Sequence, residues 1–390
     1  MIAETLCPIC GSDIVEDILS IENVPVFVSA VFRTEGQARA VNRGSIVLAL
    51  CHHCSYVWNR SFDPAKMDFA TDYDASLSSS PTYERFLDET IERLGNRYKL
   101  RDRLVVEVGC GTGHFLTKLC DYLHCRGLGI DPSAPGKINP EITNPVFLPK
   151  YYEGGGLDVC PSLLVSRQMF HCLQDPASMA RGFQRAIDGH GGVLYVEVPN
   201  ARYVFRERIA WSIYYEHVGY YSLDSLRNVF TSTGFEVRDV SECYQQGQYL
   251  YFEGMPGNAS KKRAGPGADP DFVKDVRSFG RSFQRSIEEW RGKLHRFKEE
   301  EKRVVVWGGA GRGTAFLNAL DQDRFIPFVV DNNPGRQGSF VVGTGHPILS
   351  PETLVEIDPD IVILTNATYA EEIAEQLRNM EISPECLVAN

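Results

Sequence analysis

The chain has 390 residues, of which 43% are hydrophobic, and it carries a formal net charge of −11 at pH 7. This length provides for two or three domains. The acidic balance and the lack of a basic tract argue against a nucleic-acid partner. We find no run of eighteen or more apolar residues and no signal-peptide architecture in residues 1–10. We therefore expect a cytoplasmic protein with no membrane partner.

Two Cys-x-x-Cys pairs, forty residues apart, open the chain. Eleven cysteines in a cytoplasmic protein are expected to be thiols or metal ligands rather than disulfides. Two such pairs complete a tetrahedral shell for zinc, and four protein ligands leave no open position, so the site is predicted to be structural. The alternatives are free thiols, or His52 or His53 in place of one cysteine. The predicted zinc ligands are Cys7, Cys10, Cys51 and Cys54.

A helix is predicted from Pro81, with Ser80 as its N-cap. Tyr73 precedes it, either as a packed aromatic residue or as a cover over a ligand crevice. The apolar run Leu104–Val108 then ends in the glycine turn 109–113, and a helical pattern follows. This order indicates a buried parallel strand, a tight turn and a helix whose N-terminus faces a crevice.

A second apolar stretch, Gly127–Ile130, ends in Asp131. A carboxylate there would lie beside the glycine turn and accept hydrogen bonds from ribose hydroxyls. The glycine spacing is not the G-x-G-x-x-G of dinucleotide sites. With Glu107 it reads E-x-G-x-G-x-G, which resembles the first motif of class I S-adenosylmethionine-dependent methyltransferases. Another nucleotide site and a purely structural turn are the alternatives.

Two further strands are predicted, Leu163–Ser166 and Gly192–Pro199. Residues after such strands line the ligand crevice, which makes Arg167, Gln168, His171 and Glu197 candidates. A lone histidine there is more often structural than catalytic. The residues expected to hold the cofactor S-adenosylmethionine are Glu107, Gly109, Cys110, Gly111, Gly113, Asp131, Arg167 and Gln168.

The segment Ile213–Ser222 is the densest cluster of polar and aromatic residues in the chain. Its Glu216-His217 pair offers a proton acceptor, a carboxylate and neighbouring phenols in one loop. The alternative is an aromatic loop that only covers other residues. Ser222 is expected to cap a helix over 223–233, before a strand that starts near Gly234.

Residues 255–270 are predicted to be a linker. The long helix that follows has apolar residues at steps of three and four, from Phe272 to Phe297. This stripe is expected to pack between domains, with a partner chain as the alternative.

The chain closes with a second strand, glycine turn and helix over Val304–Gly313, and with strands at 328–331 and 360–365. This unit looks more like an NAD site than the first glycine turn at 109–113 does. At about ninety residues it is only half a Rossmann domain, and no hydride-transfer residues accompany it. We favour a substrate's phosphate or nucleoside over NAD as its ligand.

The predicted fold class is α/β, in three parts. A small zinc-binding domain (1–66) precedes a class I methyltransferase domain with a doubly wound sheet (67–256). The long helix and a half-Rossmann-like domain follow (257–390).

This order resembles the three-domain sugar C-methyltransferases, which act on nucleotide-linked 4-keto-deoxysugars in antibiotic pathways. The matching residues are Tyr73, His171 and the loop 214–217; segments 330–338 and 345–348 look like the family's nucleotide-sugar segments. The resemblance implies that Tyr73, His171, Glu216 and His217 surround the reacting sugar, with His217 as base.

Two departures leave the methyl acceptor open. The family's His-Gly-Gly-Ser-x-Arg-like segment is replaced by Tyr244–Leu250, and Arg336 stands where a lysine is common. The acceptor is then another sugar or a different small metabolite, methylated on carbon, oxygen or nitrogen. An NAD-linked enzyme and a non-catalytic binding module are the remaining alternatives.

For carbon methylation beside a ketone, His217 is expected to remove the proton, and His171 is the alternative base. Glu216 is expected to orient His217 or to bind a hydroxyl. Tyr214 or Tyr73 would donate to the oxyanion. We expect a monomer or homodimer that binds a small-molecule substrate.

Overall fold

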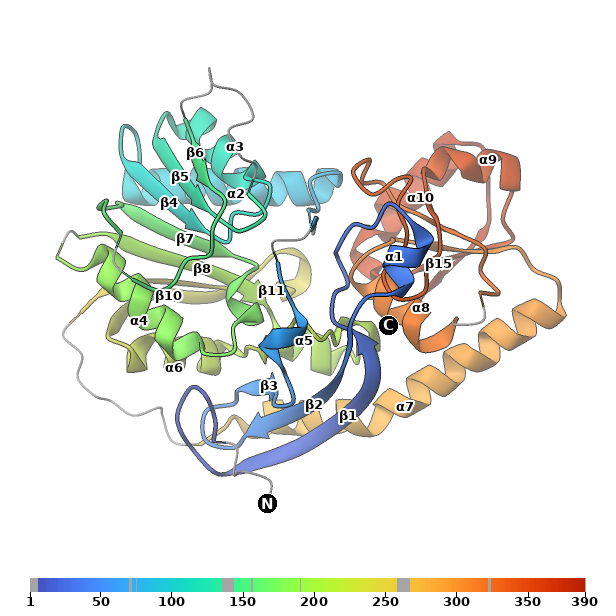
Figure 1. Cartoon of the computed structure of the whole chain (residues 1–390), viewed down its shortest axis with the longest axis horizontal. Helices are drawn as coiled ribbons and strands as arrows, with labels where there is room; N and C mark the ends of the chain where they lie inside the picture. Colours follow the sequence, from blue (N-terminus) through green and yellow to red (C-terminus); the bar gives the residue numbers. More distant parts are fainter. Residues whose placement is uncertain are drawn as a thin grey trace.

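The computed structural model describes residues 6–69, 72–74, 76–134, 144–155, 157–189, 191–257, 267–321 and 324–389. Its strands form three sheets of four, seven and five strands. Figure 1 shows the seven-stranded sheet on the left, the five-stranded sheet on the right, and the four-stranded sheet below them near the N-terminus. The predicted α/β class is confirmed.

The four-stranded sheet has the order β1-β2-β3-β9 and is antiparallel throughout. Its strands are β1 (Val15–Pro25), β2 (Arg43–Cys51), β3 (Val57–Asn59) and β9 (Gly219–Tyr220). The fourth strand comes from the segment that we assigned to the central domain, so the sheet is not built by residues 1–66 alone. Two short helices accompany the N-terminal part, α1 (Glu35–Arg39) and the 3-10 helix η1 (Pro64–Lys66).

The seven-stranded sheet has the order β10-β11-β8-β7-β4-β5-β6. Its parallel strands are β4 (Leu104–Val108), β5 (Arg126–Ile130), β6 (Val146–Leu148), β7 (Leu163–Arg167) and β8 (Val193–Pro199). The hairpin β10 (Phe235–Cys243) and β11 (Tyr249–Pro256) runs antiparallel beside β8. This is a doubly wound sheet with an antiparallel edge.

Helices cover both faces of this sheet because its strands are apolar on both sides. On one face lie α2 (Pro81–Tyr98) and α3 (His114–Leu123); on the other lie α4 (Pro176–Ile187) and α6 (Leu223–Ser232). The predicted caps are confirmed: Ser80 accepts from the amide of Tyr83, and Ser222 accepts from that of Ser225. Between β7 and α6 lie three short helices, η2 (Phe170–Cys172), α5 (Ala201–Arg206) and η3 (Ala210–Ser212).

The five-stranded sheet has the order β14-β13-β12-β15-β16 and is parallel throughout. Its strands are β12 (Val304–Trp307), β13 (Val329–Val330), β14 (Ile348–Leu349), β15 (Ile361–Leu364) and β16 (Glu385–Val388). The helices are α8 (Arg312–Leu320), α9 (Leu354–Ile357) and α10 (Ala370–Asn379), with the 3-10 helices η5 (Pro351–Thr353) and η6 (Ala367–Tyr369).

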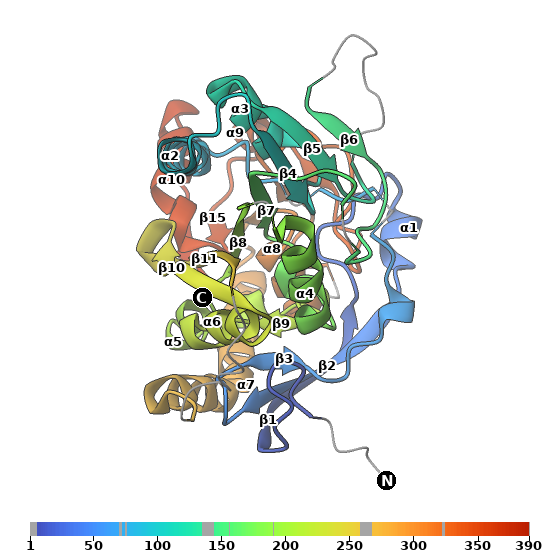
Figure 2. The same ribbon diagram turned by 90° about the vertical axis from the view of Figure 1, so that its left-hand side faces the viewer.

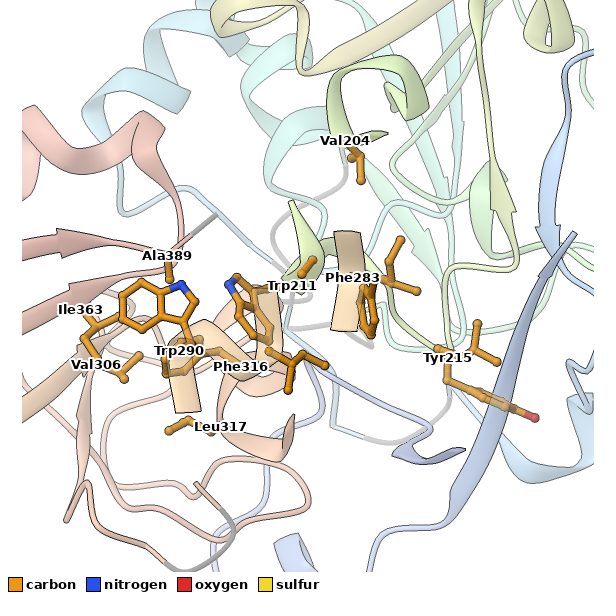
Figure 3. Packing of buried hydrophobic residues seen from close by; sticks show 14 of the residues in the cluster. Val204, Trp211, Tyr215, Phe283, Trp290, Val306, Phe316, Leu317, Ile363 and Ala389 are labelled. Carbon is orange, nitrogen blue, oxygen red and sulfur yellow. The ribbon is translucent and has the colours of Figure 1, made fainter. Parts of the chain in front are cut away.

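The long helix α7 (Pro270–Glu299) connects the parts. The predicted apolar stripe is buried along its whole length, in one core with residues of the four-stranded sheet, α5 and the five-stranded sheet. In Figure 3, Trp290 of α7 lies beside Phe316 of α8 and Trp211 of η3. The stripe therefore packs between the parts of the chain, as predicted.

The predicted linker 255–270 is shorter than expected. Met255 and Pro256 belong to β11, and Pro270 is the first residue of α7. Residues 258–266 lie outside the described part of the chain.

All eleven cysteines lie among the described residues, and none of them forms a disulfide. Among the described residues, no helix combines the length and apolarity needed to cross a membrane.

Shortening a central residue of the α7 stripe should destabilise the protein. Phe279 is fully buried, with its ring 5.2 Å from that of Phe205. We expect Phe279→Ala to lower the free energy of unfolding by about 3–5 kcal/mol, because it leaves a cavity shared by several elements. Urea unfolding measures the change, with the exposed Glu289→Ala as control. Equal free energies of unfolding for the two variants would show that α7 does not contribute to the stability of the shared core.

Candidate functional site

One cavity of about 610 Å³ is lined by residues that follow the strands of both parallel sheets. From the seven-stranded sheet it receives the glycine turn after β4 and the residues after β5, β7 and β8. From the five-stranded sheet it receives the turn after β12 and the residues after β13 and β15. Figure 2 looks at the molecule from the side of the seven-stranded sheet, with the five-stranded sheet behind it. The cavity lies where ligands bind in open α/β sheets, at the carboxyl ends of the strands.

The first glycine turn brings bare backbone to the cavity. Gly109 and Gly111 have φ values of 78° and 51°, which favour glycine. A Cβ atom on Gly109 would lie 2.5 Å from Met169, whereas one on Gly111 would meet nothing within 4 Å. The backbone at Gly111 is therefore open to a ligand.

Asp131 lies beside this turn, as predicted. Its Oδ2 accepts from the amide of Gly111 at 3.0 Å, and its Oδ1 accepts from the amide of Ser133 at 2.7 Å. The carboxylate thus fixes the turn and keeps lone pairs for ribose hydroxyls. Gly113 does not line the cavity: a Cβ there would lie 2.3 Å from the ring of Phe147. Its role is to allow close packing behind the turn.

Glu107 is the most unusual group near the turn. Its side chain is 2% exposed and lines the cavity, and its Oε2 has no hydrogen-bond partner within the described part of the chain. Burial raises its pKa to about 8, although the Arg167 guanidinium opposes this shift. An unpartnered carboxyl oxygen of this kind suits a ligand that brings a cation, such as the ammonium group of an amino acid.

Arg167 and Gln168 line the cavity, but Glu197 at the end of β8 engages both side chains. The Arg167 Nη2 and Nε donate to Glu197 at 2.9 and 3.3 Å, and the Gln168 Nε2 donates at 3.0 Å. Tyr195 donates to the same carboxylate, and Tyr83 accepts from Arg167. Arg167 and Gln168 therefore line the cavity as predicted, and Glu197 fixes the positions of both side chains.

The second glycine turn repeats the arrangement of the first. Gly308 and Gly311 have φ values of 109° and 52°. Asp331 after β13 accepts from the amide of Gly309 at 2.8 Å and from that of Asn333 at 2.8 Å. Two nucleoside-type turns thus face one cavity, each with an acid that follows the neighbouring strand.

The loop 213–222 is held by the four-stranded sheet. Its β9 pairs with β3, and the amide of Asn59 donates to the carbonyl of Val218 at 2.8 Å. The packing is close, since a Cβ on Gly219 would lie 2.1 Å from the hydroxyl of Tyr56. The N-terminal sheet therefore positions the predicted catalytic loop.

Glu216 does not orient His217 in this structure. Its Oε1 accepts from the hydroxyl of Tyr73 at 3.0 Å, and its Oε2 accepts from the amide of Val28 at 3.2 Å. Burial raises the pKa of Glu216 to about 7. The carboxylate connects the loop with the two N-terminal segments that carry Tyr73 and Val28.

His217 contacts two other predicted residues. Its ring centroid lies 4.2 Å from that of His171 and 4.5 Å from that of Tyr214, and all three residues line the cavity. Burial lowers the pKa of His171 to about 3. Burial, His171 and the Arg312 cation also lower the pKa of His217 well below its ordinary value. Burial raises the pKa of Tyr214. Both imidazoles are therefore neutral at physiological pH.

The cavity also contains residues that the sequence analysis missed. They include Tyr83, Tyr203, Gln248, Tyr249, Trp307 and Arg312. Arg312 could have been found, because it directly follows the second glycine turn. Of the two segments compared with nucleotide-sugar segments, Asp331–Arg336 contributes to the cavity. His346 of the other is fully buried, with its Nε2 3.0 Å from Asp321.

The four predicted zinc ligands converge at the edge of the four-stranded sheet. Their sulfur atoms all lie within 4.8 Å of one another, and the pairs Cys7–Cys54 and Cys10–Cys51 are 3.6 Å apart. Tetrahedral zinc with bonds near 2.3 Å separates its sulfur ligands by about 3.8 Å. His52 contacts Glu16 instead, at 2.8 Å. The donor set fits a structural zinc ion.

Loss of one zinc ligand should release the metal and weaken the protein. We expect one zinc per wild-type chain and less than one in Cys51→Ser. The melting temperature of the variant should fall by on the order of 10 °C, because metal binding stabilises the fold by several kcal/mol. Elemental analysis and thermal unfolding measure both effects, with the exposed Cys386→Ser as control. A metal-free wild type of full stability would contradict this prediction.

Glu107 should make stability depend on pH. Its folded pKa of about 8 exceeds the unfolded value near 4.3, so its proton stabilises the fold at low pH. This contribution to the free energy of unfolding is lost as the pH rises towards 8, at up to about 1.4 kcal/mol per pH unit. Without ligand, Glu107→Gln should gain stability relative to wild type between pH 5 and pH 8 in urea unfolding. The control is Glu89→Gln, at an exposed position. If the free energies of unfolding of Glu107→Gln and wild type differed by the same amount at pH 5 and at pH 8, the raised pKa of Glu107 would be contradicted.

Comparison with known proteins finds methyltransferases. Residues 82–240 match the family model described as methyltransferase domain, and residues 269–385 match the one described as C-methyltransferase C-terminal domain. The chain is 27% identical to the C-methyltransferase NovU of Streptomyces niveus over 394 residues, which cover 95% of this chain and 91% of that protein.

Two further likenesses are confined to part of the chain. A tRNA U34 carboxymethyltransferase of Campylobacter jejuni is 24% identical over 123 residues, 27% of this chain and 42% of that protein. The PH0226 protein of Pyrococcus horikoshii OT3 superposes with a TM-score of 0.37 and 14% identity, over 45% of this chain and 92% of that chain. By the two family models and the relative that matches over 95% of the chain, this protein is an S-adenosylmethionine-dependent methyltransferase, and its residues 269–385 are similar to the C-terminal domain of C-methyltransferases.

Proposed function

We propose that this enzyme transfers a methyl group from S-adenosylmethionine to a carbon beside the ketone of a nucleotide-linked keto-deoxysugar. The observation that carries the proposal is the single cavity that both glycine turns enter, with His171 and His217 in its wall. A donor and an acceptor that each carry a nucleoside could then meet beside the two imidazoles.

The turn after β4 is the donor end. The open backbone at Gly111 and the carboxylate of Asp131 suit a nucleoside, and Glu107 suits the ammonium of the methionine part. Arg167, held by Glu197 and Tyr83, lies close enough to Glu107 to affect its pKa. The donor supplies an electrophilic methyl group on a sulfonium, so the protein has to prepare the nucleophile.

The turn after β12 is the acceptor end. Two cations line the cavity there, Arg312 at the start of α8 and Arg336 after β13. Neither forms an ion pair within 4.0 Å in the described part of the chain, and the Arg336 Nη2 donates only to the carbonyl of Ser29. Two guanidinium groups without a carboxylate partner among the described residues, one of them at the N-terminus of α8, suit the phosphates of a nucleotide.

His217 acts as the base in this proposal. Its low pKa keeps the imidazole neutral, so it can accept the proton from the carbon beside the ketone. The C–H bond breaks, the proton moves to His217, and the electron pair forms an enolate. The enolate carbon then attacks the methyl group as the carbon–sulfur bond breaks.

Tyr214 is the proposed donor to the enolate oxygen, since its buried phenol remains protonated and its ring contacts that of His217. Tyr73 is less suited, because its hydroxyl donates to Glu216. His171 lies against His217 and is the alternative base.

Three further proposals remain. Structural zinc is proposed for the four cysteines, cytoplasm for the location, and a monomer or homodimer for the assembly. The native mass of the purified protein reports the bound zinc and the number of chains in the assembly. Fractionation of cells reports the location.

The test is a panel of nucleoside diphosphate 4-keto-deoxysugars incubated with S-adenosylmethionine. We expect release of S-adenosylhomocysteine with at least one sugar, and a product with one added methyl on a carbon next to the carbonyl, located by NMR. A product methylated on oxygen or nitrogen, or no turnover across the panel while other metabolites react, would refute the proposed acceptor.

Replacing the base should remove most of the activity. We expect His217→Asn to lower kcat by about 10²–10⁴-fold with unchanged unfolding, because general base catalysis contributes that much. His171→Asn, measured in parallel, distinguishes the two imidazoles. The control is His295→Asn on the exposed face of α7, where the side chain is 72% exposed. Wild-type turnover in His217→Asn would exclude it as base.

A further inference from the structure

The connection between β10 and β11 has an unusual backbone. Tyr244, Gln245 and Gln246 have φ values of 55°, 28° and 56°, and Gly247 follows at 81°. Positive φ is uncommon for any residue other than glycine, and for a bulky aromatic residue such as Tyr244 it is an outlier. Three such residues in a row persist only where the surroundings hold them, and strained backbone of this kind concentrates at functional sites.

Contacts from three directions hold this segment, which we name the 244–248 loop. The Asn200 Nδ2 donates to the carbonyl of Gly247 at 2.7 Å, and the Asn200 amide donates to the carbonyl of Gln248 at 2.8 Å. The ring of Tyr244 packs 4.9 Å from those of Phe86 and Tyr249. The loop is thus anchored to β8, α2 and β11 of the methyltransferase part.

The loop also reaches the C-terminal part. The hydroxyls of Tyr244 and Tyr369 are 3.0 Å apart, and the Gln248 Nε2 donates to the Oγ1 of Thr368. Thr368 and Tyr369 belong to η6, which follows β15 at the second glycine turn. The loop therefore spans the junction between the donor and acceptor ends of the cavity.

Gln248 is the residue that the loop presents to the cavity. Its side chain is 5% exposed and lines the cavity wall. Since its amide nitrogen is directed to Thr368, its Oε1 is left as an acceptor, and none of the described residues donates to it. Residues 244–249 contain no side chain that is charged at neutral pH, so this part of the wall offers a neutral acceptor.

We propose that the 244–248 loop determines acceptor specificity, with the Gln248 Oε1 accepting a hydrogen bond from a hydroxyl of the bound sugar. This inference rests on the proposed function and adds the group that the enzyme selects. A buried acceptor left unpaired is costly, so an analogue without that hydroxyl is rejected. The strained backbone turns Gln248 towards the cavity while keeping its nitrogen on Thr368.

The experiment compares binding of sugars that differ by one hydroxyl. The probes are thymidine diphosphate glucose and its 2-, 3-, 4- and 6-deoxy analogues, with dissociation constants from calorimetry in the presence of S-adenosylhomocysteine. In wild type, we expect one analogue to bind about tenfold more weakly than the parent. In Gln248→Leu this difference should vanish through weaker binding of the parent, while the affinity for S-adenosylhomocysteine is unchanged.

Two controls isolate the amide oxygen. Gln245→Leu makes the same change at an exposed position of the same loop that does not line the cavity, and it should keep the wild-type selectivity. Should Gln248→Leu unfold, Gln248→Asn keeps the amide and withdraws it by one methylene. That variant should lose the selectivity as well.

The outcomes separate this inference from the proposed function. Equal affinities for all five sugars in wild type, or undiminished selectivity in the Gln248 variants, overturn the role of Gln248 and leave the proposed function standing. Absence of binding by all five sugars overturns this inference, and the proposed function falls with it only if the panel of 4-keto-deoxysugars also shows no turnover. Selectivity lost in the Gln248 variants and kept in Gln245→Leu supports the inference.

Discussion

The short pairing of β3 with β9 is the interaction on which the site depends. It joins the four-stranded sheet, which begins at the cysteine cluster, to the loop that carries Glu216 and His217. The connection is short: Cys54 is followed by Ser55, whose carbonyl accepts from Ser222, and by Tyr56, which packs under Gly219. A metal ion bound by the cysteine cluster would therefore hold in place the loop that carries the proposed base, although none of the four cysteines lines the cavity.

A second constraint fixes the distance between the two glycine turns. The core around α7 joins the four-stranded and five-stranded sheets with α5, the helix that follows β8 of the seven-stranded sheet. Smaller contacts close the junction at the cavity, such as that between the Asn333 Nδ2 and Asp74 at 2.7 Å and that between the Ser80 hydroxyl and Glu372 at 2.9 Å. These contacts and the core around α7 together hold the parts that carry the two glycine turns around one cavity.

Local elements could be predicted from sequence because their signals are local. The strand Leu104–Val108, the caps at Ser80 and Ser222, and the clustering of four cysteines all follow from spacing and composition. The partners that these elements contact across the fold could not be predicted from the sequence. Periodicity tells which face of an element is buried and not what it contacts. The pairing of β9 with β3, Glu197 with Arg167, and Tyr73 with Glu216 therefore emerged only in three dimensions.

Burial has the same effect on four titratable groups that line the cavity. The pKa values of the acids Glu107 and Glu216 are raised, and those of the bases His171 and His217 are lowered, so each group favours its neutral form. Such a wall binds charge poorly until a ligand brings the opposite sign. In the proposed reaction, a sulfonium donor with an ammonium group would bring positive charge to Glu107, and a nucleotide would bring negative charge to Arg312. Both charges would be present together only when both substrates are bound, so the proposed anionic carbon beside His217 would be stabilised only in that ternary complex.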